Sequence, residues 1–267
     1  MNRLAGKVAI VTGAGSIGPG IGNGKAASVL FAREGAKLLL VDKNAESLER
    51  TASLAAAEGA TVRSVVADVS LNSGCETIRE TCLEHFGRVD VLHNNVGIEI
   101  PGGLEATSEE DWDATMRVNL KSMFLLCRQI LPRMAAQRSG SVLNISSINA
   151  VRTLPALSLA YGVSKAGVIA FTRELAIEYA PSNVRVNAIL PGAMATPFAT
   201  ASLSAAYGGD HDEMMRLRDN LSPMGQQGEA WDVANLAVFL ASEEAKYVTA
   251  AAMVVDGGQS ARLSANK

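Results

Sequence analysis

A tyrosine and a lysine four residues apart, Tyr161 and Lys165, open a helical stretch of the chain. Side chains at this spacing lie on one face of a helix. A lysine ammonium beside a phenol favours the phenolate, so it lowers a pKa that is ordinarily about 10. The pair is therefore a candidate general acid or base, although the same spacing also occurs on ordinary helix surfaces.

Two serines strengthen this interpretation because of where they stand. Ser146 and Ser147 directly follow the apolar run Val142 to Ile145, which predicts a strand. In parallel sheets, sites form at the carboxyl edge of the strands. A serine hydroxyl at that edge can donate a hydrogen bond to an oxygen that gains negative charge. For Ser146, a role as a strand-end cap is the alternative.

A glycine-rich stretch lies between the first apolar run, which ends at Thr12, and a helical run that begins at Lys25. Backbone amides in such a turn, together with the positive end of the following helix, can bind a pyrophosphate. Glycine allows the close approach because no β-carbon intervenes. The candidate contacts in this stretch are Gly13, Gly15, Ser16, Gly20, Ile21, Gly22, Asn23 and Gly24.

An acidic residue, Asp42, ends the second predicted strand. A carboxylate there can accept hydrogen bonds from both hydroxyls of an adenosine ribose and would repel a 2'-phosphate, which favours NAD(H) over NADP(H). The neighbouring Lys43 weakens this discrimination. A plain turn residue after a strand is the alternative for Asp42.

The elements that would position these residues alternate between short apolar runs and longer helical stretches. This alternation is typical of the α/β class and predicts a doubly wound, Rossmann-like parallel sheet of seven strands with helices on both faces. The predicted strands are Lys7 to Val11, Lys37 to Val41, Thr61 to Val66, Val89 to His93, Ser141 to Ile145, Arg185 to Ile189 and Met253 to Val255. The predicted helices are Lys25 to Glu34, Ala45 to Glu58, Ser73 to Phe86, Trp112 to Met134, Tyr161 to Tyr179 and Ala230 to Leu240.

The length of the chain, 267 residues, fits a single domain over residues 1–267. One stretch, about residues 193–228, breaks the alternation with small residues, methionines and an acidic patch. A long irregular stretch in a compact domain is more often functional than connective. We interpret it as a lid over the substrate.

Composition excludes several classes of function. The formal net charge is −3 and the isoelectric point is about 5.7, so no basic field attracts nucleic acid. No segment approaches the roughly 20 apolar residues of a membrane helix. The three cysteines lack CxxC spacing and the three histidines form no ligand cluster, so we expect no metal, reduced thiols and a cytoplasmic location.

The ordered set of motifs resembles the short-chain dehydrogenase/reductase family from Lys7 to Gly258. No single motif is decisive, but their order along the chain is specific. The motifs are Thr12-Gly13, Asp68-Val69, Asn94-Asn95-Val96-Gly97, Asn119 in Val118-Asn119-Leu120, Asn144-Ile145-Ser146-Ser147, Tyr161 with Lys165, Asn187 through Pro191-Gly192 to Thr196, and Asp256-Gly257-Gly258.

The resemblance implies catalytic roles for four residues. Tyr161 would be the proton donor or acceptor, and Lys165 would lower its pKa and hold the nicotinamide ribose. Ser147 would orient the substrate oxygen, and Asn119 would hold a water that links Lys165 to solvent. The implied reaction is reversible oxidation of a secondary alcohol, a small molecule, to a ketone with NAD(H).

The resemblance also implies the remaining cofactor contacts and a quaternary structure. Asp68 and Val69 would contact adenine; Asn95, Val96 and Gly97 would line the cofactor; Pro191, Gly192 and Thr196 would surround the nicotinamide. The helices predicted at 112–134 and 161–179 pair across subunits in that family, so we expect a homotetramer. The alternatives for function are an NADPH-dependent reductase of 3-oxoacyl thioesters and a non-catalytic NAD(H) sensor.

The chain departs from the family pattern in three places. The glycine-rich loop is several residues longer, and counting back from Gly35 selects Gly22 and Gly24 as its last two glycines, whereas counting forward selects Gly20 and Gly22. We prefer the backward count, which puts Asn23 where an isoleucine usually stands. Val96 replaces an alanine. The interval from Ser147 to Tyr161 is one residue wider than usual, which leaves Ser146 as the alternative serine.

Overall fold

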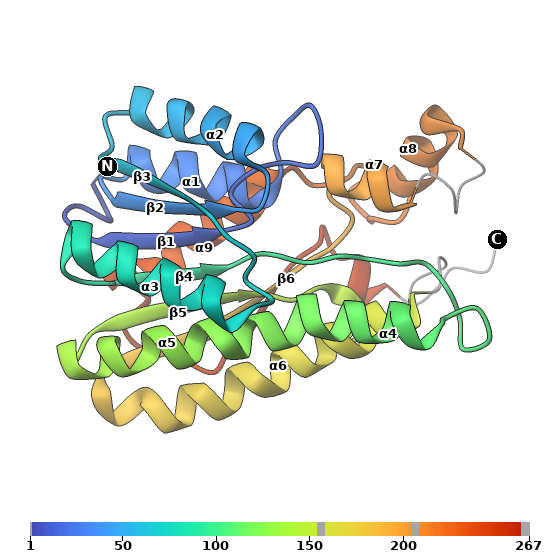
Figure 1. Cartoon of the computed structure of the whole chain (residues 1–267). Coiled ribbons are helices and arrows are strands. Elements are labelled where there is room, and N and C mark those ends of the chain that lie inside the picture. The colour runs from blue at the N-terminus through green and yellow to red at the C-terminus, as the bar shows by residue number, and fades with distance from the viewer. Residues whose placement is uncertain (1, 154–157, 204–208, 263–267) are drawn as a thin grey trace.

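The computed structural model describes residues 2–153, 158–203 and 209–262, and it is built around one parallel sheet (Figure 1). The sheet has seven strands in the order β3-β2-β1-β4-β5-β6-β7. The chain adds strands on one side of β1 and then returns to add β4 on the other side, so the carboxyl ends of β1 and β4 flank the point where the order reverses. The strands are β1 (Val8–Thr12), β2 (Lys37–Asp42), β3 (Val62–Val66), β4 (Val91–Asn94), β5 (Gly140–Ile145), β6 (Val184–Pro191) and β7 (Ala252–Val255).

Helices cover both faces of this sheet (Figure 1). One face is covered by α1 (Asn23–Arg33), α2 (Ala45–Ala57) and α9 (Ala230–Ala241). The other is covered by α3 (Asn72–Phe86), α5 (Ser122–Gln137) and α6 (Leu159–Tyr179). The further helices are α4 (Glu109–Met116), α7 (Pro197–Leu203) and α8 (His211–Asp219), with 3₁₀ turns at Ile148–Ala150, Ala180–Ser182, Glu243–Ala245 and Gln259–Ala261.

The core follows from strands that carry an unbroken apolar run, such as Leu38 to Val41 in β2. In β2, Leu38 and Leu40 pack under α1 and α2, whereas Leu39 and Val41 pack on the opposite side with residues of α3. Successive side chains of a strand point to opposite faces, so a strand that is covered on both faces needs an uninterrupted apolar run. This is why the sequence of the central strands shows no alternation.

The predicted fold class is confirmed, with seven parallel strands and helices on both faces. The strand ends coincide with the predicted ones or differ from them by at most two residues. The helix predicted over Trp112 to Met134 begins earlier and is divided: α4 and α5 are joined by a π-helical turn, Arg117–Lys121. An additional residue in one turn leaves the apolar pattern on either side intact, so periodicity does not reveal it.

The stretch predicted as a lid contains regular structure that its composition conceals. It holds α7 and α8, and its residues 204–208 lie outside the described residues. The acidic patch is a helix start: the Asp210 side chain accepts a hydrogen bond from the Glu213 amide at 3.0 Å, and Asp212 stands in the first turn. Acidic residues stabilise this end of a helix. Both helices lie beyond the carboxyl edge of the sheet (Figure 1).

No helix in the described ranges is both long enough and apolar enough to span a bilayer. Those same residues contain no group of three or more histidine, cysteine, aspartate or glutamate side chains placed to hold a metal ion.

Candidate active site

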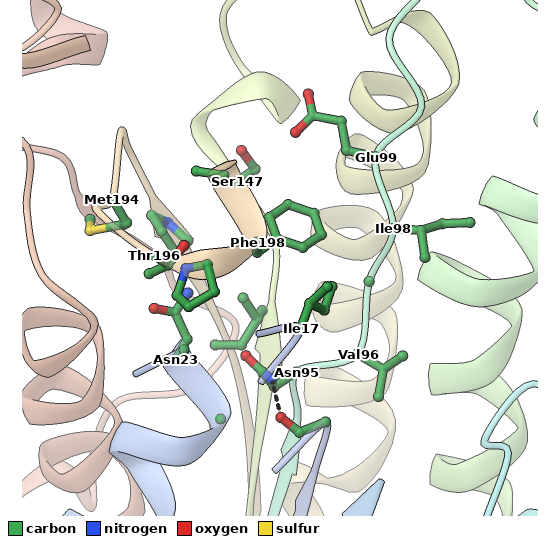
Figure 2. A pocket seen from close by; sticks show the side chains of 18 of the residues that line it. Ile17, Asn23, Asn95, Val96, Ile98, Glu99, Ser147, Met194, Thr196 and Phe198 are labelled. Atoms are coloured by element: carbon green, nitrogen blue, oxygen red, sulfur yellow. Dashed lines mark hydrogen bonds between the residues drawn. The ribbon is translucent and has the colours of Figure 1, made fainter. Parts of the chain in front are cut away.

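A cavity of about 510 Å³ opens at the carboxyl edge of the sheet, where the strand order reverses (Figure 2). It brings together most of the residues predicted from sequence. Those lining it are Gly13, Gly15, Ser16, Gly22, Asn23, Gly24, Asp42, Asp68, Val69, Asn95, Val96, Gly97, Ser147, Tyr161, Lys165, Pro191, Gly192 and Thr196. Three predicted residues, Gly20, Ile21 and Asn119, do not line it.

The turn between β1 and α1 is tightly folded at its glycines. Gly13 has φ +62°, in the left-handed region that favours glycine. A β-carbon on Gly24 would overlap the Gly13 carbonyl oxygen, and one on Gly15 would lie 2.9 Å from the Asp42 Oδ2. The main chain of this turn therefore forms a cradle that only glycine permits, with the amino end of α1 directed toward the cavity.

The additional residues of the loop project away from the cradle. Gly20 and Ile21 line a second hollow of about 240 Å³, between the loop and α7. Lys25 donates a hydrogen bond from Nζ to the Gly20 carbonyl oxygen at 3.0 Å, and the Gly22 amide donates to the Ser16 Oγ at 3.1 Å. The loop is thus tied down at both ends, and Gly22 and Gly24 flank the start of the helix, the arrangement that the backward count gives.

Asn23 carries an acceptor that nothing in the described chain satisfies. Its Oδ1 is buried and has no hydrogen-bond partner, and the side chain lines the cavity near Thr196 (Figure 2). A buried acceptor without a partner costs free energy until a donor reaches it. Together with the glycine cradle, this atom indicates that the cavity is shaped to hold a ligand that also brings hydrogen-bond donors.

Asp42 stands at the end of β2 with its carboxylate half-buried at the cavity. Oδ2 accepts a hydrogen bond from the Gly15 amide at 2.9 Å, and Oδ1 accepts one from the Asn44 amide at 2.9 Å. These bonds fix the carboxylate beside the cradle while each oxygen keeps a lone pair for a ligand.

The segment after β4 is held against both neighbouring loops. The Asn95 amide donates to the Thr12 Oγ1 at 3.1 Å, and its Nδ2 donates to the Gly13 carbonyl oxygen at 3.1 Å (Figure 2). A β-carbon on Gly97 would lie 3.2 Å from the Lys165 Nζ. The chain therefore passes close to the lysine, and a larger residue here would require the lysine side chain to shift.

Asn119 lies behind the cavity wall, in the π-helical turn, with none of its surface exposed. Its Oδ1 accepts from the Ile98 amide at 2.8 Å, and its Nδ2 donates to the Ile98 carbonyl oxygen at 2.9 Å and to the Ser164 Oγ at 3.0 Å. One side chain thus joins the segment after β4 to α6, which carries Tyr161 and Lys165.

Tyr161 and Lys165 lie on one face of α6, and both are buried. The Lys165 Nζ lies 5.5 Å from the centroid of the Tyr161 ring and donates a hydrogen bond to the Ile145 carbonyl oxygen at 2.8 Å. The Ser146 Oγ donates to the Lys165 carbonyl oxygen at 2.7 Å. Ser146 therefore fastens α6 to the end of β5, and Ser147 is the serine whose hydroxyl faces Tyr161.

Burial has the largest effect on the pKa values of both members of the pair. Burial lowers the pKa of Lys165 to about 8, and the nearby Glu99 carboxylate opposes that shift. Burial also raises the pKa of Tyr161; Glu99 raises it further, and only the hydrogen bond from Ser147 lowers it. The net shift of the Tyr161 pKa is therefore upward in this structure, because desolvation of the phenolate is its largest cause. That Lys165 lowers the pKa of Tyr161 stays a prediction.

Comparison with known proteins gives the family. The family model described as enoyl-(acyl carrier protein) reductase matches residues 17–260. The 3-oxoacyl-[acyl-carrier-protein] reductase of Thermotoga maritima is 38% identical over 256 residues, which cover 96% of this chain and 98% of that protein. The chain belongs to the short-chain dehydrogenase/reductase family.

Two further relatives resemble this short-chain dehydrogenase/reductase over almost its whole length. Dehydrogenase/reductase SDR family member 6 of Aquarana catesbeiana is 38% identical over 262 residues, 97% of this chain and 100% of that protein. A crystal structure of a putative short-chain dehydrogenase/reductase from Burkholderia xenovorans has a TM-score of 0.95 and 43% identity, with 99% of this chain and 100% of that chain covered. The protein is therefore an oxidoreductase of a family that uses a nicotinamide cofactor and acts on small molecules.

Sequence reasoning missed two charged residues of this dehydrogenase/reductase that line the same cavity, Glu99 and Arg218. Glu99 comes two residues after Gly97, directly after the segment at the sheet edge. This position could have indicated that its charged side chain belongs to the site. Arg218 lies on α8, where it donates to the Gln227 Oε1 at 2.8 Å and to the Met194 carbonyl oxygen at 3.2 Å. No local pattern marks it as part of the site.

Proposed function

We propose that this protein catalyses the reversible oxidation of a secondary alcohol to a ketone with NAD(H), and that Tyr161 is the general acid or base. The observation that carries this proposal is the meeting of the Tyr161 and Ser147 hydroxyls at one cavity, with Lys165 buried behind them. The nicotinamide, when bound, supplies the site that accepts or donates the hydride.

The residues of the chain divide the remaining work. The Ser147 hydroxyl orients the substrate oxygen, and Tyr161 takes its proton in oxidation or gives one in reduction. Lys165 supplies the positive charge that favours proton loss from Tyr161 and holds the nicotinamide ribose. Asn119 fixes the segment after β4 against α6 and holds the water that relays protons from Lys165.

The cradle and its neighbours fit a dinucleotide. The pyrophosphate would lie over Gly13, Gly15, Ser16 and the start of α1, where backbone amides and the helix dipole favour an anion. Asp42 would hold the adenosine ribose, and Asp68 and Val69 the adenine. The middle of the dinucleotide would be lined by Asn95, Val96 and Gly97. The nicotinamide would be surrounded by Pro191, Gly192 and Thr196, and Asn23 would accept a hydrogen bond from the nicotinamide. Gly20 and Ile21 would support the cradle from outside.

The preference for NAD rests on Asp42. Its carboxylate is fixed by two backbone amides at the end of β2. If the adenosine ribose binds there, the 2'-phosphate of NADP would meet a like charge. A second candidate is an NADPH-dependent reductase of 3-oxoacyl thioesters, which the name of the Thermotoga maritima relative favours. A sensor without turnover has no need of Tyr161, Ser147 and Lys165 together.

We further propose that α7 and α8 form a lid over the substrate, that residues 1–267 act as a single domain, that the protein is cytoplasmic, and that it is a homotetramer. Phe198 and Leu203 of α7 line the cavity, which supports the lid. Exposed apolar side chains on α5 and α6, namely Phe124, Val163 and Ile177, support an interface between subunits.

A panel of alcohols and ketones, read by nicotinamide absorbance with NAD and NADP in parallel, tests the reaction and the cofactor together. We expect turnover of at least one secondary alcohol, with kcat/KM at least about tenfold higher for NAD, because a tenfold ratio corresponds to only about 1.4 kcal/mol. An NADP preference of that size would overturn the role of Asp42, and 3-oxoacyl thioesters as the only reduced compounds would establish the second candidate.

Replacing the proposed acid–base group tests the mechanism. Tyr161→Phe should reduce kcat about 10²-fold to 10⁴-fold, the usual contribution of a positioned acid or base, while NADH fluorescence titration gives an unchanged Kd. Tyr179→Phe, at the far end of the same helix, is the matched control and should keep full activity. Full turnover by Tyr161→Phe would exclude it as the proton donor.

A further inference from the structure

Glu99 lies at the end of the cavity where the substrate must react. Figure 2 shows its side chain at the same end as Ser147, whereas Asn95 and Asn23 lie toward the other end, beside the cradle. Glu99 therefore stands away from the residues that would hold the pyrophosphate. Its carboxylate belongs to the part of the cavity left for the substrate.

Glu99 shares the cavity with apolar side chains. It is half-buried, and Ile98, Phe198 and Met194 line the same cavity. Burial raises the pKa of Glu99. A carboxylate in such surroundings costs free energy unless hydrogen-bond donors reach it.

The polar groups that face Glu99 come from two other elements. Ser158, at the start of α6, has its hydroxyl toward the carboxylate, yet the Ser158 Oγ is buried without a partner at hydrogen-bond distance among the described residues. Arg218 of α8 and Lys165 of α6 contribute positive charge. Arg218 also bonds Gln227 and the Met194 carbonyl, so its guanidinium is directed in part at the lid.

Glu99 acts against the oxidation direction of the proton transfer proposed for Tyr161. Its negative charge raises the pKa of Tyr161, so the phenolate that alcohol oxidation needs is harder to form. Proton transfer in that direction gives no reason to keep a carboxylate that is costly to bury. A contact with the substrate gives such a carboxylate a use.

We propose that Glu99 accepts a hydrogen bond from a second donor group of the substrate, a hydroxyl or ammonium near the reacting carbinol, and thereby selects diols, polyols and amino alcohols over simple alcohols. The inference rests on the proposed alcohol oxidation and specifies its substrate class. A 3-hydroxyacyl thioester has a carbonyl acceptor, and no second donor, one methylene away from its carbinol carbon, so Glu99 also disfavours the thioester candidate. A carboxylate at that place on the substrate meets a like charge.

Three matched compounds test the proposal: cyclohexanol, trans-cyclohexane-1,2-diol and trans-2-aminocyclohexanol. With NAD, the wild-type protein should have a kcat/KM about tenfold to a hundredfold higher for the two donor-bearing compounds, as expected for hydrogen bonds to a charged group. Glu99→Leu should remove that preference while cyclohexanol is oxidised at least as fast. Glu99→Gln, which keeps the shape and an acceptor oxygen, should retain a preference for the diol and lose any extra preference for the amine.

Glu105→Leu is the matched control, because Glu105 is an exposed carboxylate a few residues further along that does not line the cavity. It should behave as the wild type. Equal kcat/KM for cyclohexanol and the diol, or an unchanged preference in Glu99→Leu, would overturn the proposal. Circular dichroism and thermal unfolding check that both Glu99 variants are folded.

A binding measurement separates this inference from the proposed reaction. Saturation-transfer NMR with the diol, the amino alcohol and cyclohexanol reports contact with the protein whether or not anything is oxidised. If no alcohol or ketone is turned over, the proposed function fails. A diol signal that Glu99→Leu loses and Glu105→Leu keeps would still establish Glu99 as the binding residue, and equal signals for all three compounds would reject it.

Discussion

Tyr161 is a phenol whose surroundings favour its protonated form. Burial and the Glu99 carboxylate both raise its pKa, and the Ser147 hydrogen bond lowers it. At neutral pH the side chain is therefore a proton donor, the state needed to reduce a ketone. Oxidation of an alcohol needs the phenolate, so that direction depends on pH.

We expect kcat/KM for alcohol oxidation to rise with pH between about pH 6 and about pH 10, because the population of the Tyr161 phenolate grows over this range. Glu99→Gln removes a negative charge that disfavours the phenolate, so its profile should shift to lower pH. Stopped-flow pH profiles of the two proteins measure the shift, with Glu105→Gln as the control. A profile that moves to higher pH contradicts the assignment of Glu99.

His93 is a second buried titratable group, and it affects stability, not the reaction. Its ring lies edge-on to Phe31 with centroids 5.9 Å apart, and neither ring nitrogen has a hydrogen-bond partner in the described structure. Burial lowers its pKa from about 6.5 to about 4. Protons therefore bind the unfolded chain more readily than the folded one.

The folded state should lose stability as the pH falls from about 6.5 to about 4, by up to about 3 kcal/mol from this residue alone. The His93→Leu protein cannot take up this proton, so its free energy of unfolding should fall less over the same pH range. Urea unfolding of both proteins at pH 7, 5.5 and 4 measures the difference. Parallel losses in the two proteins would show that His93 does not carry the effect.

Some helices and strands could be predicted from sequence patterns, and others could not. Central strands such as β2 could be located because burial on both faces demands an unbroken apolar run, and α1 could be located because glycines precede it. The π-helical turn at Arg117–Lys121 could not, because its cause is a tertiary contact: Asn119 bonds Ile98 and Ser164, which are distant in sequence. The start of α8 was obscured since its acidic cap residues suggest a loop.

The lengthened glycine loop depends on one lysine side chain. Lys25 is 6% exposed, and its Nζ bonds the Gly20 carbonyl oxygen. Lys25→Met keeps the length of the side chain but releases the loop, so we expect the Kd for NADH to rise about fivefold, equivalent to about 1 kcal/mol. Fluorescence titration measures this, and Lys37→Met, an exposed lysine at the start of β2, is the control. An unchanged Kd would mean that the loop keeps its place without Lys25.

At the scale of the whole molecule, the cavity joins segments that the sequence keeps far apart. Tyr161, Ser147 and the glycine loop could be predicted to meet, because each stands at the carboxyl end of a parallel strand or beside it. That Glu99 and Arg218 line the same cavity could not be predicted, since it depends on where α8 lies over the sheet edge. For this reason, substrate specificity is harder to predict from sequence than the type of reaction.

The proposed tetramer predicts a change of assembly when its apolar surface is altered. Ile177 is 69% exposed on α6, and Ile177→Glu would place a charge in a subunit interface, so we expect dissociation to smaller species. Size-exclusion chromatography with light scattering reports the mass. Glu178→Lys, on the same helix, serves as a surface control. A wild-type mass equal to one chain would refute the tetramer.

The π-helical turn sets the phase between two helical surfaces. It contains one residue more than an α-helix would use. The helix before it, α4, packs on α6, and the helix after it, α5, packs on β5 and α3. Five residues of a π-turn cover nearly the same rotation as four residues of an α-helix, so deleting one residue of the turn would leave α4 and α5 on their present faces. The deletion would instead remove the widened turn in which Asn119 bonds Ile98 and Ser164. A change that is nearly free for the helix itself would thus weaken the link between the segment after β4 and the helix that carries Tyr161.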